Sequence, residues 1–259
     1  MRNIGMQGKS DQQTHLFSRE EHGRVARATA LSTHPILTLW MAILTCAILA
    51  STTLARPPAT QPAKPAWRNL FDGKSLKGWE ASDFAGHADP LVENGTIVLP
   101  FGEALTGVTY TGELPKVNYE VELDAKRVDG ADFFCGLTFP VNDTFASLIV
   151  GGWGGAVCGI SSLDGQDAAR NETKSARRFV ANKWYHIRLR VLPDKLQAWI
   201  DKEKIIDAST RGRKITTRPE INAGKPLGIA SYQTTAALRN IRIRALPAEA
   251  DAAKPARKS

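Results

Sequence analysis

Apolar and polar side chains alternate in short runs between residues 67 and 246. In residues 118–128 (NYEVELDAKRV), apolar residues alternate with charged or polar ones, which is the period of a strand with one buried face. Residues 184–192 (WYHIRLRVL) and 236–246 (AALRNIRIRAL) alternate less cleanly, with arginines on the polar side. The pattern predicts strands that turn one face to the core and the other to water.

Turn signals separate these runs every ten or so residues. The Asn-Gly step at 94–95 lies between two short apolar runs and is a strong hairpin signal. Turn residues at 142–143 and 193–195 predict two further hairpins. Helical periodicity is absent apart from a short turn near 168–175. The sequence therefore predicts an all-β fold, a sandwich of two antiparallel sheets.

The N-terminal segment predicts export. An uninterrupted apolar run, 36–50, follows Arg24 and Arg27 and precedes small residues that end at Ala55. This is the layout of a signal peptide with a long N-terminal extension, spanning residues 1–55. The run is shorter than the roughly 20 residues of a membrane span, so the mature form is expected to have none. An uncleaved N-terminal anchor is the alternative. The predicted location is secreted or periplasmic.

The rest of the chain divides by composition. Residues 56–66 (RPPATQPAKPA) are expected to be an extended Pro/Ala linker. Residues 67–246 are long enough for one domain with a sizeable core. Residues 247–259 are again rich in Ala, Pro and Lys and are expected to be a disordered tail.

The chain carries a formal net charge of +8, and its basic residues are clustered. The clusters lie near 174–178, 211–214 and 239–244, in turns or in strand-like alternation, and no nucleic-acid-binding module is recognisable. We therefore expect a solvated basic face and no nucleic-acid partner. Weak attraction to an anionic polysaccharide is the alternative.

Five segments carry a resemblance to a known family. They are LFDGKSLKGW (70–79), VENGTIVL (92–99), NYEVELDAKR (118–127), WYHIRLRVLPDKLQAWID (184–201) and PLGIASYQTTAALRNIRIRAL (226–246). In this order they resemble the secreted 3-keto-disaccharide hydrolase domain family, over about residues 67–246. The resemblance implies a concanavalin A-like jelly-roll β-sandwich, similar to lectins, laminin G modules and some glucanases. In that fold Trp79 is expected to close the first edge.

The resemblance also implies an activity, the cleavage of glycosides oxidised to a ketone at sugar carbon 3. Such a ketone acidifies the neighbouring C–H, so that a base removes the proton, the glycosidic oxygen leaves and water adds back. The site needs a general base, a donor to the enolate oxygen and an acid for the leaving group. The Glu-x-Gln…Asp pattern of many members is missing from 131–155, which predicts a divergent branch. A non-catalytic carbohydrate-binding module, like a lectin or laminin G domain, is the alternative, and an interaction module of a surface assembly is a third.

The most unusual stretch is GGWGG, residues 151–155. Glycines such as Gly152 and Gly154 would let the backbone approach a ligand and leave the Trp153 indole open for stacking on a sugar. A β-bulge with Trp153 folded inward is the alternative.

Three carboxylates are candidates for acid–base catalysis. Glu172 lies in a polar loop beside Asn171, whose amide would also contact a sugar; an ordinary surface loop is the alternative. Asp132 flanks the end of a Phe-rich strand. Glu120 lies on the polar face of its strand, which is either a concave binding face or a solvated sheet face.

Two further residues are candidates for substrate binding. Asn142 flanks a strand end, where turn formation is the competing role. His186 alternates with arginines along its strand and is either a base or a structural histidine.

Cysteine and metal signals are weak. Cys135 and Cys158 lie in apolar strand-like runs, where export permits a disulfide and buried free thiols are equally ordinary. No spacing typical of a metal site exists, so neither a metal nor another cofactor is predicted, although jelly rolls often bind calcium. The expected partner is a carbohydrate or glycoside, and a monomer is expected.

Overall fold

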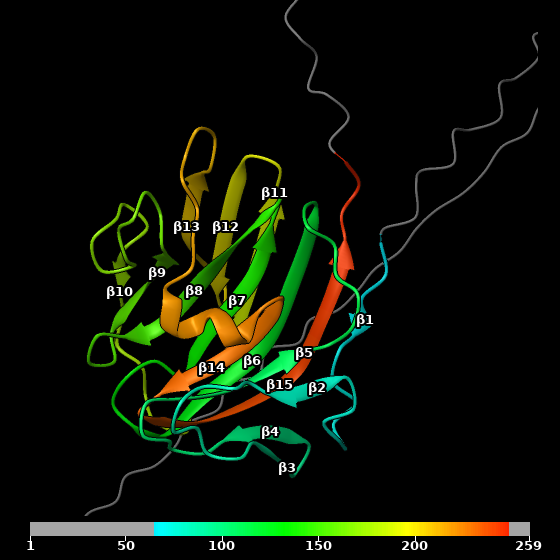
Figure 1. Cartoon of the computed structure of the whole chain (residues 1–259), viewed down its shortest axis with the longest axis vertical. Coiled ribbons are helices and arrows are strands. Elements are labelled where there is room, and N and C mark those ends of the chain that lie inside the picture. Colours follow the sequence, from blue (N-terminus) through cyan, green and yellow to red (C-terminus); the bar gives the residue numbers. More distant parts are fainter. Residues whose placement is uncertain (1–64, 249–259) are drawn as a thin grey trace, which may run out of the picture. The chain divides into compact units, whose positions relative to one another are not determined.

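Two antiparallel β-sheets packed face to face form the structure, a computed structural model that describes residues 65–248 (Figure 1). Sheet A has the order β13-β12-β11-β6-β15-β4-β3, and β1 also pairs with β15. Its strands are β1 (Arg68–Asn69), β3 (Leu91–Glu93), β4 (Thr96–Leu99), β6 (Tyr119–Gly130), β11 (Tyr185–Leu192), β12 (Lys195–Ile200), β13 (Glu203–Ser209) and β15 (Thr234–Ala245). This confirms the concanavalin A-like jelly-roll sandwich predicted from the sequence.

Sheet B has the order β10-β9-β8-β7-β14-β5-β2. Its strands are β2 (Trp79–Ala81), β5 (Leu105–Tyr110), β7 (Cys135–Val141), β8 (Thr144–Gly152), β9 (Val157–Ser161), β10 (Ser175–Ala176) and β14 (Leu227–Tyr232). The three predicted hairpins are confirmed as β3–β4, β7–β8 and β11–β12.

One helical element, the 3-10 helix η1 (Pro219–Gly224), occurs in the described part of the chain. It begins at a proline, which suits the first helical position because its fixed φ is already helical. Figure 1 shows η1 as the orange coil in front of β14. The short turn predicted near 168–175 is confirmed, because that segment consists of turns that lead into β10.

The inner faces of the two sheets form one apolar core. Along β6, Tyr119, Val121 and Leu123 point inward and are fully buried, as the alternation predicts. The buried Tyr119 hydroxyl donates a hydrogen bond of 2.6 Å to the carbonyl of Pro140 in β7. This bond joins the two sheets, and burial raises the pKa of Tyr119 well above its usual range.

The opening motif of the domain pins the edge of sheet B. Trp79 begins β2, which pairs with β5, and its side chain is only 4% exposed. Its indole Nε1 donates to the carbonyl of Leu70 at 2.7 Å. The Asp72 carboxylate accepts hydrogen bonds from the backbone N–H groups of Lys74 and Ser75, which fixes the turn from Asp72 to Ser75. Trp79 therefore closes the edge of the sandwich, as the resemblance implied.

The two cysteines of the domain are expected to remain free thiols. Cys135 in β7 and Cys158 in β9 both lie opposite Val150 of β8, so one strand separates them. Two strand spacings put their Cα atoms about 9.6 Å apart, whereas a disulfide requires less than about 7 Å. Burial raises the pKa of Cys135 to about 12 and that of Cys158 to about 11, which leaves both thiols unreactive.

A reducing agent should therefore leave the melting temperature of the domain unchanged. Thiol titration after unfolding without reductant should find both Cys135 and Cys158 reactive. A fall in melting temperature on reduction, together with fewer reactive thiols, would show that a disulfide joins the two cysteines and that their Cα atoms lie closer together than this fold allows.

Several sequence predictions lie outside the described residues. These are the signal peptide of residues 1–55, most of the linker of 56–66 and most of the tail of 247–259. Within 65–248, no helix has both the length and the apolar character needed to cross a membrane.

Candidate functional site

A cavity of about 490 Å³ opens on the outer face of sheet B. Strands β5, β8, β9 and β14 contribute to its lining, together with η1, the residues that flank β7, and the β8–β9 turn. The lining residues are Ala104, Leu105, Asp132, Phe133, Ser147, Ile149, Trp153, Ser161, Arg218, Glu220, Ile221 and Tyr232. The cavity is within the size range of small-molecule sites.

The alternation along β8 supplies the floor of the cavity. Leu148 and Val150 point into the core, so Ser147 and Ile149 point outward to the cavity. The Ser147 hydroxyl lies 3.0 Å from that of Thr138 on β7. The floor therefore presents hydroxyl groups beside an aliphatic side chain.

Small residues on the outer face of sheet B allow η1 to lie close to the strands. A Cβ placed on Gly228 of β14 would lie only 2.3 Å from the carbonyl oxygen of Gly224 in η1. Ile221 of η1 packs into a small apolar cluster with Phe84, Leu105 and Ala230. This packing fixes η1 over the sheet and positions Glu220 at the cavity.

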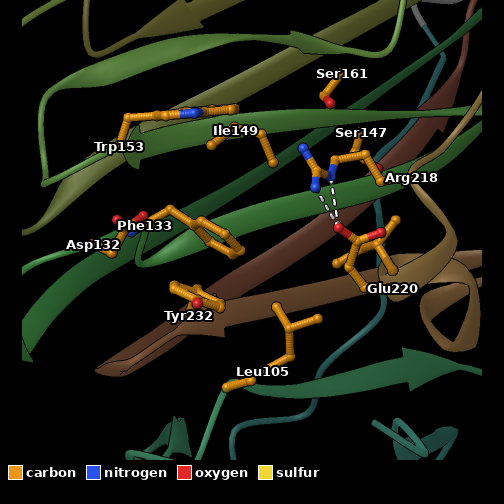
Figure 2. A pocket seen from close by; sticks show the side chains of 12 residues that line it. Leu105, Asp132, Phe133, Ser147, Ile149, Trp153, Ser161, Arg218, Glu220 and Tyr232 are labelled. Carbon is orange, nitrogen blue, oxygen red and sulfur yellow. Dashed lines mark hydrogen bonds and ion pairs between the residues drawn. The ribbon is translucent and has the colours of Figure 1, made fainter. Parts of the chain in front are cut away.

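One side of the cavity is aromatic. Figure 2 shows Trp153, Phe133 and Tyr232 grouped on one side and the pair of Arg218 and Glu220 on the other. The Phe133 and Tyr232 rings are stacked, with centroids 5.8 Å apart and planes 26° apart. Trp153 is 44% exposed, in the turn between β8 and β9. Aromatic faces in an open cleft suit stacking on the apolar face of a sugar ring.

The glycines around Trp153 make room for a buried arginine. A Cβ on Gly151 would lie 2.9 Å from Nη2 of Arg127, and one on Gly155 would lie 3.1 Å from its Nη1. Arg127 Nη2 donates to the carbonyls of Gly151 and Gly155, at 3.3 and 3.1 Å. Asp132 accepts the N–H of Gly154 at 2.9 Å. The turn is therefore held from beneath by the Arg127 guanidinium and laterally by a carboxylate.

Gly152 and Gly154 were predicted to let the backbone approach a ligand. Neither glycine is among the residues that line the cavity. A Cβ on Gly152 would lie 2.9 Å from the Ile149 side chain, so this glycine permits close packing. Gly154 has a φ of +80°, which a glycine adopts without strain, and it supplies the N–H that Asp132 accepts.

The polar side of the cavity is an ion pair. Arg218 Nε donates to Glu220 Oε1 at 2.8 Å, and Arg218 Nη1 lies 3.8 Å from Asp167 Oδ2. The backbone N–H of Glu220 itself and the Arg218 guanidinium hold the pKa of the Glu220 carboxyl below its usual range, against a smaller opposing effect of burial. Glu220 is therefore ionised at neutral pH, the form that accepts a proton.

The structure places two of the three carboxylates predicted to be catalytic away from the cavity. Glu172 lies in the loop between β9 and β10 and pairs with Arg213. Asn171, next to it, is buried, and its amide donates to the carbonyls of Ile160, Gln166 and Asp167. These bonds make Asn171 an organiser of its own loop.

Glu120 lies on the outer face of sheet A. It was expected on a wet face, but its side chain is fully buried. Arg190 of β11 and Arg244 of β15 reach over it from both sides. Burial would raise the pKa of Glu120, but hydrogen bonds from Arg244 and Arg190 outweigh it and lower the pKa.

The remaining sequence candidates are also separate from the cavity. His186 lies on the outer face of sheet A, where its Nδ1 is 3.0 Å from the Asp124 carboxylate. That hydrogen bond raises the pKa of His186, although burial opposes it. Asn142 occupies the β7–β8 hairpin turn with a φ of +52°, and its amide donates to the carbonyl of Pro193 at 3.0 Å. Of the candidates, Trp153 and Asp132 line the cavity.

Sequence reasoning missed most of the polar lining. Arg218 and Glu220 flank a proline that signals a helix start, but nothing in the local pattern indicates that this turn covers a sheet. Tyr232 lies within the closing block of the family resemblance and Phe133 in the Phe-rich run, so both were visible without a role.

Metal ligands do not gather in the described domain. Among residues 65–248, no three His, Cys, Asp or Glu side chains come close enough together to hold a metal ion. The expectation of no metal or other cofactor remains a prediction, and so does the alternative of a calcium site.

Comparison with known proteins gives one extended match. A family model, the 3-keto-alpha-glucoside-1,2-lyase-like domain, matches residues 66–244. No curated protein matches the sequence.

Solved structures with a similar chain path have low identity. A carbohydrate-binding module from Bacillus subtilis is 16% identical, with a TM-score of 0.44, over 65% of this chain and 96% of its own. A putative glycosyl hydrolase from Parabacteroides distasonis is 18% identical, with a TM-score of 0.44, over 70% of this chain and 94% of its own. The beta-glucanase of Bacillus licheniformis is 10% identical, with a TM-score of 0.45, over 71% of this chain and 99% of its own.

Proposed function

Because the chain belongs to the 3-keto-alpha-glucoside-1,2-lyase-like domain family, we propose that it cleaves glycosides carrying a ketone at sugar carbon 3, in the cavity on sheet B. The observation that carries the proposal is the arrangement of an ionised Glu220 beside a guanidinium, opposite an aromatic wall in one cleft. A base, a cation for developing negative charge and a sugar platform are the groups that the chemistry needs.

In the proposed reaction, Glu220 removes the proton from carbon 2 of the sugar, next to the ketone. The electron pair first forms an enolate, whose oxygen is stabilised by the Arg218 guanidinium. Expulsion of the glycosidic oxygen from carbon 1 then leaves a double bond between carbons 1 and 2. The Tyr232 hydroxyl protonates the leaving oxygen, and addition of water to the double bond completes a net hydrolysis.

Trp153 is proposed as the sugar platform, and its backbone supports this role. Its φ is +50°, a region that a bulky side chain occupies at a cost of about 1 kcal/mol or more. Asparagine tolerates this region better. Trp153→Asn should therefore keep or raise the free energy of unfolding while weakening glycoside binding about tenfold, the loss of roughly 1.4 kcal/mol of stacking. Chemical denaturation and calorimetric titration of the same samples measure both effects.

The matched control is Phe101→Asn, because Phe101 is an exposed aromatic residue in a loop outside the cavity. It should leave glycoside affinity unchanged. Equal affinity of the Trp153→Asn variant and the parent protein would remove the indole from the proposed site.

A non-catalytic carbohydrate-binding module is the second candidate function. It is favoured because Asp132, the other carboxylate of the cavity, is occupied by hydrogen bonds to the backbone of its own loop. Both Asp132 oxygens accept backbone N–H groups, from Phe133 at 2.8 Å and from Gly154 at 2.9 Å. Asp132 thus serves the loop, which leaves Glu220 as the cavity carboxylate closest to an acid–base role.

Incubating the purified protein with a 3-keto-glucoside and with the same glucoside unoxidised tests the proposal. Turnover of the keto sugar alone is the expected result, since only the ketone acidifies the neighbouring proton. Saturable binding of either sugar without turnover would favour the binding module. The absence of both binding and turnover would contradict both functions.

We further propose that the protein acts outside the cytoplasm as a monomer, after removal of residues 1–55. The support is the sequence of the N-terminal segment and the carbohydrate-active family to which the domain belongs. N-terminal sequencing of secreted protein tests the cleavage after Ala55.

A further inference from the structure

The outer face of sheet A carries an ordered array of charges. Down the central strand β6, Glu120, Glu122 and Asp124 point outward. Neighbouring β11 places Arg190, Arg188 and His186 beside them, and β15 places Arg244, Arg242 and Arg239 on the other side. We call these nine residues the charge ladder.

Each carboxylate of the ladder is bracketed by two bases. Arg190 and Arg244 bind Glu120. Arg242 binds Glu122 and Arg239 binds Asp124, while the His186 ring lies between these two carboxylates. Five arginines thus accompany three carboxylates, so the ladder has a positive surplus even with His186 neutral.

Arg188 supplies part of that surplus. No ion pair joins Arg188 to a carboxylate of residues 65–248, although it lies opposite Glu122 in the sheet. Its guanidinium instead lies over the Trp199 ring, 4.0 Å from the centroid. Stacking on the indole holds the guanidinium in place, while the N–H groups at its edge stay able to donate hydrogen bonds.

Tryptophans flank the ladder on both sides. Trp199 stacks with Arg188 and Arg190, and Trp67 stacks with Arg242 and Arg244. Trp184 lies under Arg239 and Lys126. The face thus presents guanidinium groups held in place by indoles, rather than long side chains free in solvent.

The spacing of the cations is set by the sheet. Residues two apart along a strand are about 6.8 Å apart, and β11 and β15 lie about 9.6 Å apart on either side of β6. The two rows of bases are therefore separated by a row of carboxylates. A polymer whose negative charges are spaced by several ångströms can meet these cations one by one, while the arginines cover the carboxylates between the rows.

We propose that this face of sheet A binds a polyuronate, a polysaccharide that carries a carboxylate on each sugar. Arginine binds carboxylates bidentately, and five arginines here already bind or neighbour carboxylates. Nucleic acid carries a charge about every 1.7 Å, far more closely than the ladder's cations, which the sheet holds about 6.8 Å apart along each strand. The site is separate from the cavity, which opens on sheet B.

Binding of polygalacturonate to the purified protein, measured by calorimetric titration at low and high salt, tests the proposal. Binding is expected at low salt and should weaken as salt rises, because part-exposed charges are screened. Neutral dextran should not bind, and dextran sulfate should bind more weakly than polygalacturonate. Equal or tighter binding of dextran sulfate or DNA, or no binding of polygalacturonate, would overturn it.

Arg188→Gln and Lys116→Gln form the matched pair of variants. Arg188 has no carboxylate partner within the described residues, so its loss should leave the ladder and the melting temperature intact. It should weaken polygalacturonate binding about fivefold, the loss of one charge-assisted contact. Lys116, exposed at the Asp143 turn, removes the same charge elsewhere and should change affinity less than twofold. Equal effects of the two variants would mean that net charge alone attracts the polymer. That result would overturn the proposal of a binding site on this face.

Discussion

Replacing Glu220 by glutamine is expected to lower the turnover of a 3-keto-glucoside by about 10²–10⁴-fold, the usual contribution of a general base. Glutamine keeps the shape of the side chain but cannot accept the proton. Affinity should change far less than the rate constant, because the aromatic wall and the cavity floor remain. Single-turnover kinetics with the keto sugar, beside a binding titration, separates the two effects.

The pH dependence of the same reaction follows from the Glu220 carboxyl. Its folded-state pKa lies below the usual value, so the proton-accepting form persists at mildly acidic pH and is lost only as pH falls through that lowered value. Turnover should therefore stay constant from neutral pH down to about pH 5, above the ordinary glutamate pKa of about 4.3.

Glu172→Gln is the control for this variant. Glu172 is an exposed carboxylate outside the cavity that pairs with Arg213, and its sequence context made it a candidate for acid–base catalysis. Its replacement should leave turnover within about twofold, as expected for an exposed ion pair. Loss of turnover in the Glu172 variant with full turnover in the Glu220 variant would move the chemistry to the β9–β10 loop.

Replacing Glu120 by leucine is expected to lower the free energy of unfolding by about 3 kcal/mol, the lower end of what removing one partner of a buried ion pair costs. The carboxylate is fully buried between Arg190 and Arg244, and the latter is only 12% exposed. Its removal leaves two guanidinium groups without their acceptor. Turnover per folded molecule should not change, because Glu120 lies on the sheet opposite the cavity.

The matched control is Asp143→Asn, which breaks a pair with Lys116 in which both side chains are largely exposed. It should cost less than about 0.5 kcal/mol. Urea unfolding of both variants and the parent measures the difference. The Glu120 contribution should also fade in acid: the folded-state pKa is lowered, so the stability is present above the unfolded pKa and lost as pH falls through the folded one. Similar small losses for both variants would contradict a buried ladder.

Alternation and turn residues were sufficient to predict the sandwich and three of its hairpins. A strand with one apolar face needs a second layer to bury it, and Asn-Gly fixes the register of a hairpin. Alternation cannot tell what lies over a polar face. Glu120 was expected in water because the arginines that cover it come from strands some 70 and 124 residues away in sequence.

The cavity was predicted only in part for the same reason. Trp153 among its glycines was visible as unusual, but the glycines accommodate Arg127, whose proximity depends on the packing of β6 against the β8–β9 turn. Glu220 lies in a single helical turn with no periodicity to mark it. Its place at the cavity follows from the packing of η1 on sheet B, a contact between distant segments that no local pattern encodes.

The most direct test follows the tryptophan indole N–H resonances by NMR while a 3-keto-glucoside is added to the Glu220→Gln variant. Trp153 lines the cavity, whereas Trp67, Trp184 and Trp199 lie among the arginines of sheet A and Trp79 is buried. The expected result is a saturable shift of the Trp153 resonance alone. An unchanged Trp153 resonance, with shifts confined to the tryptophans of sheet A, would contradict the sugar site on sheet B.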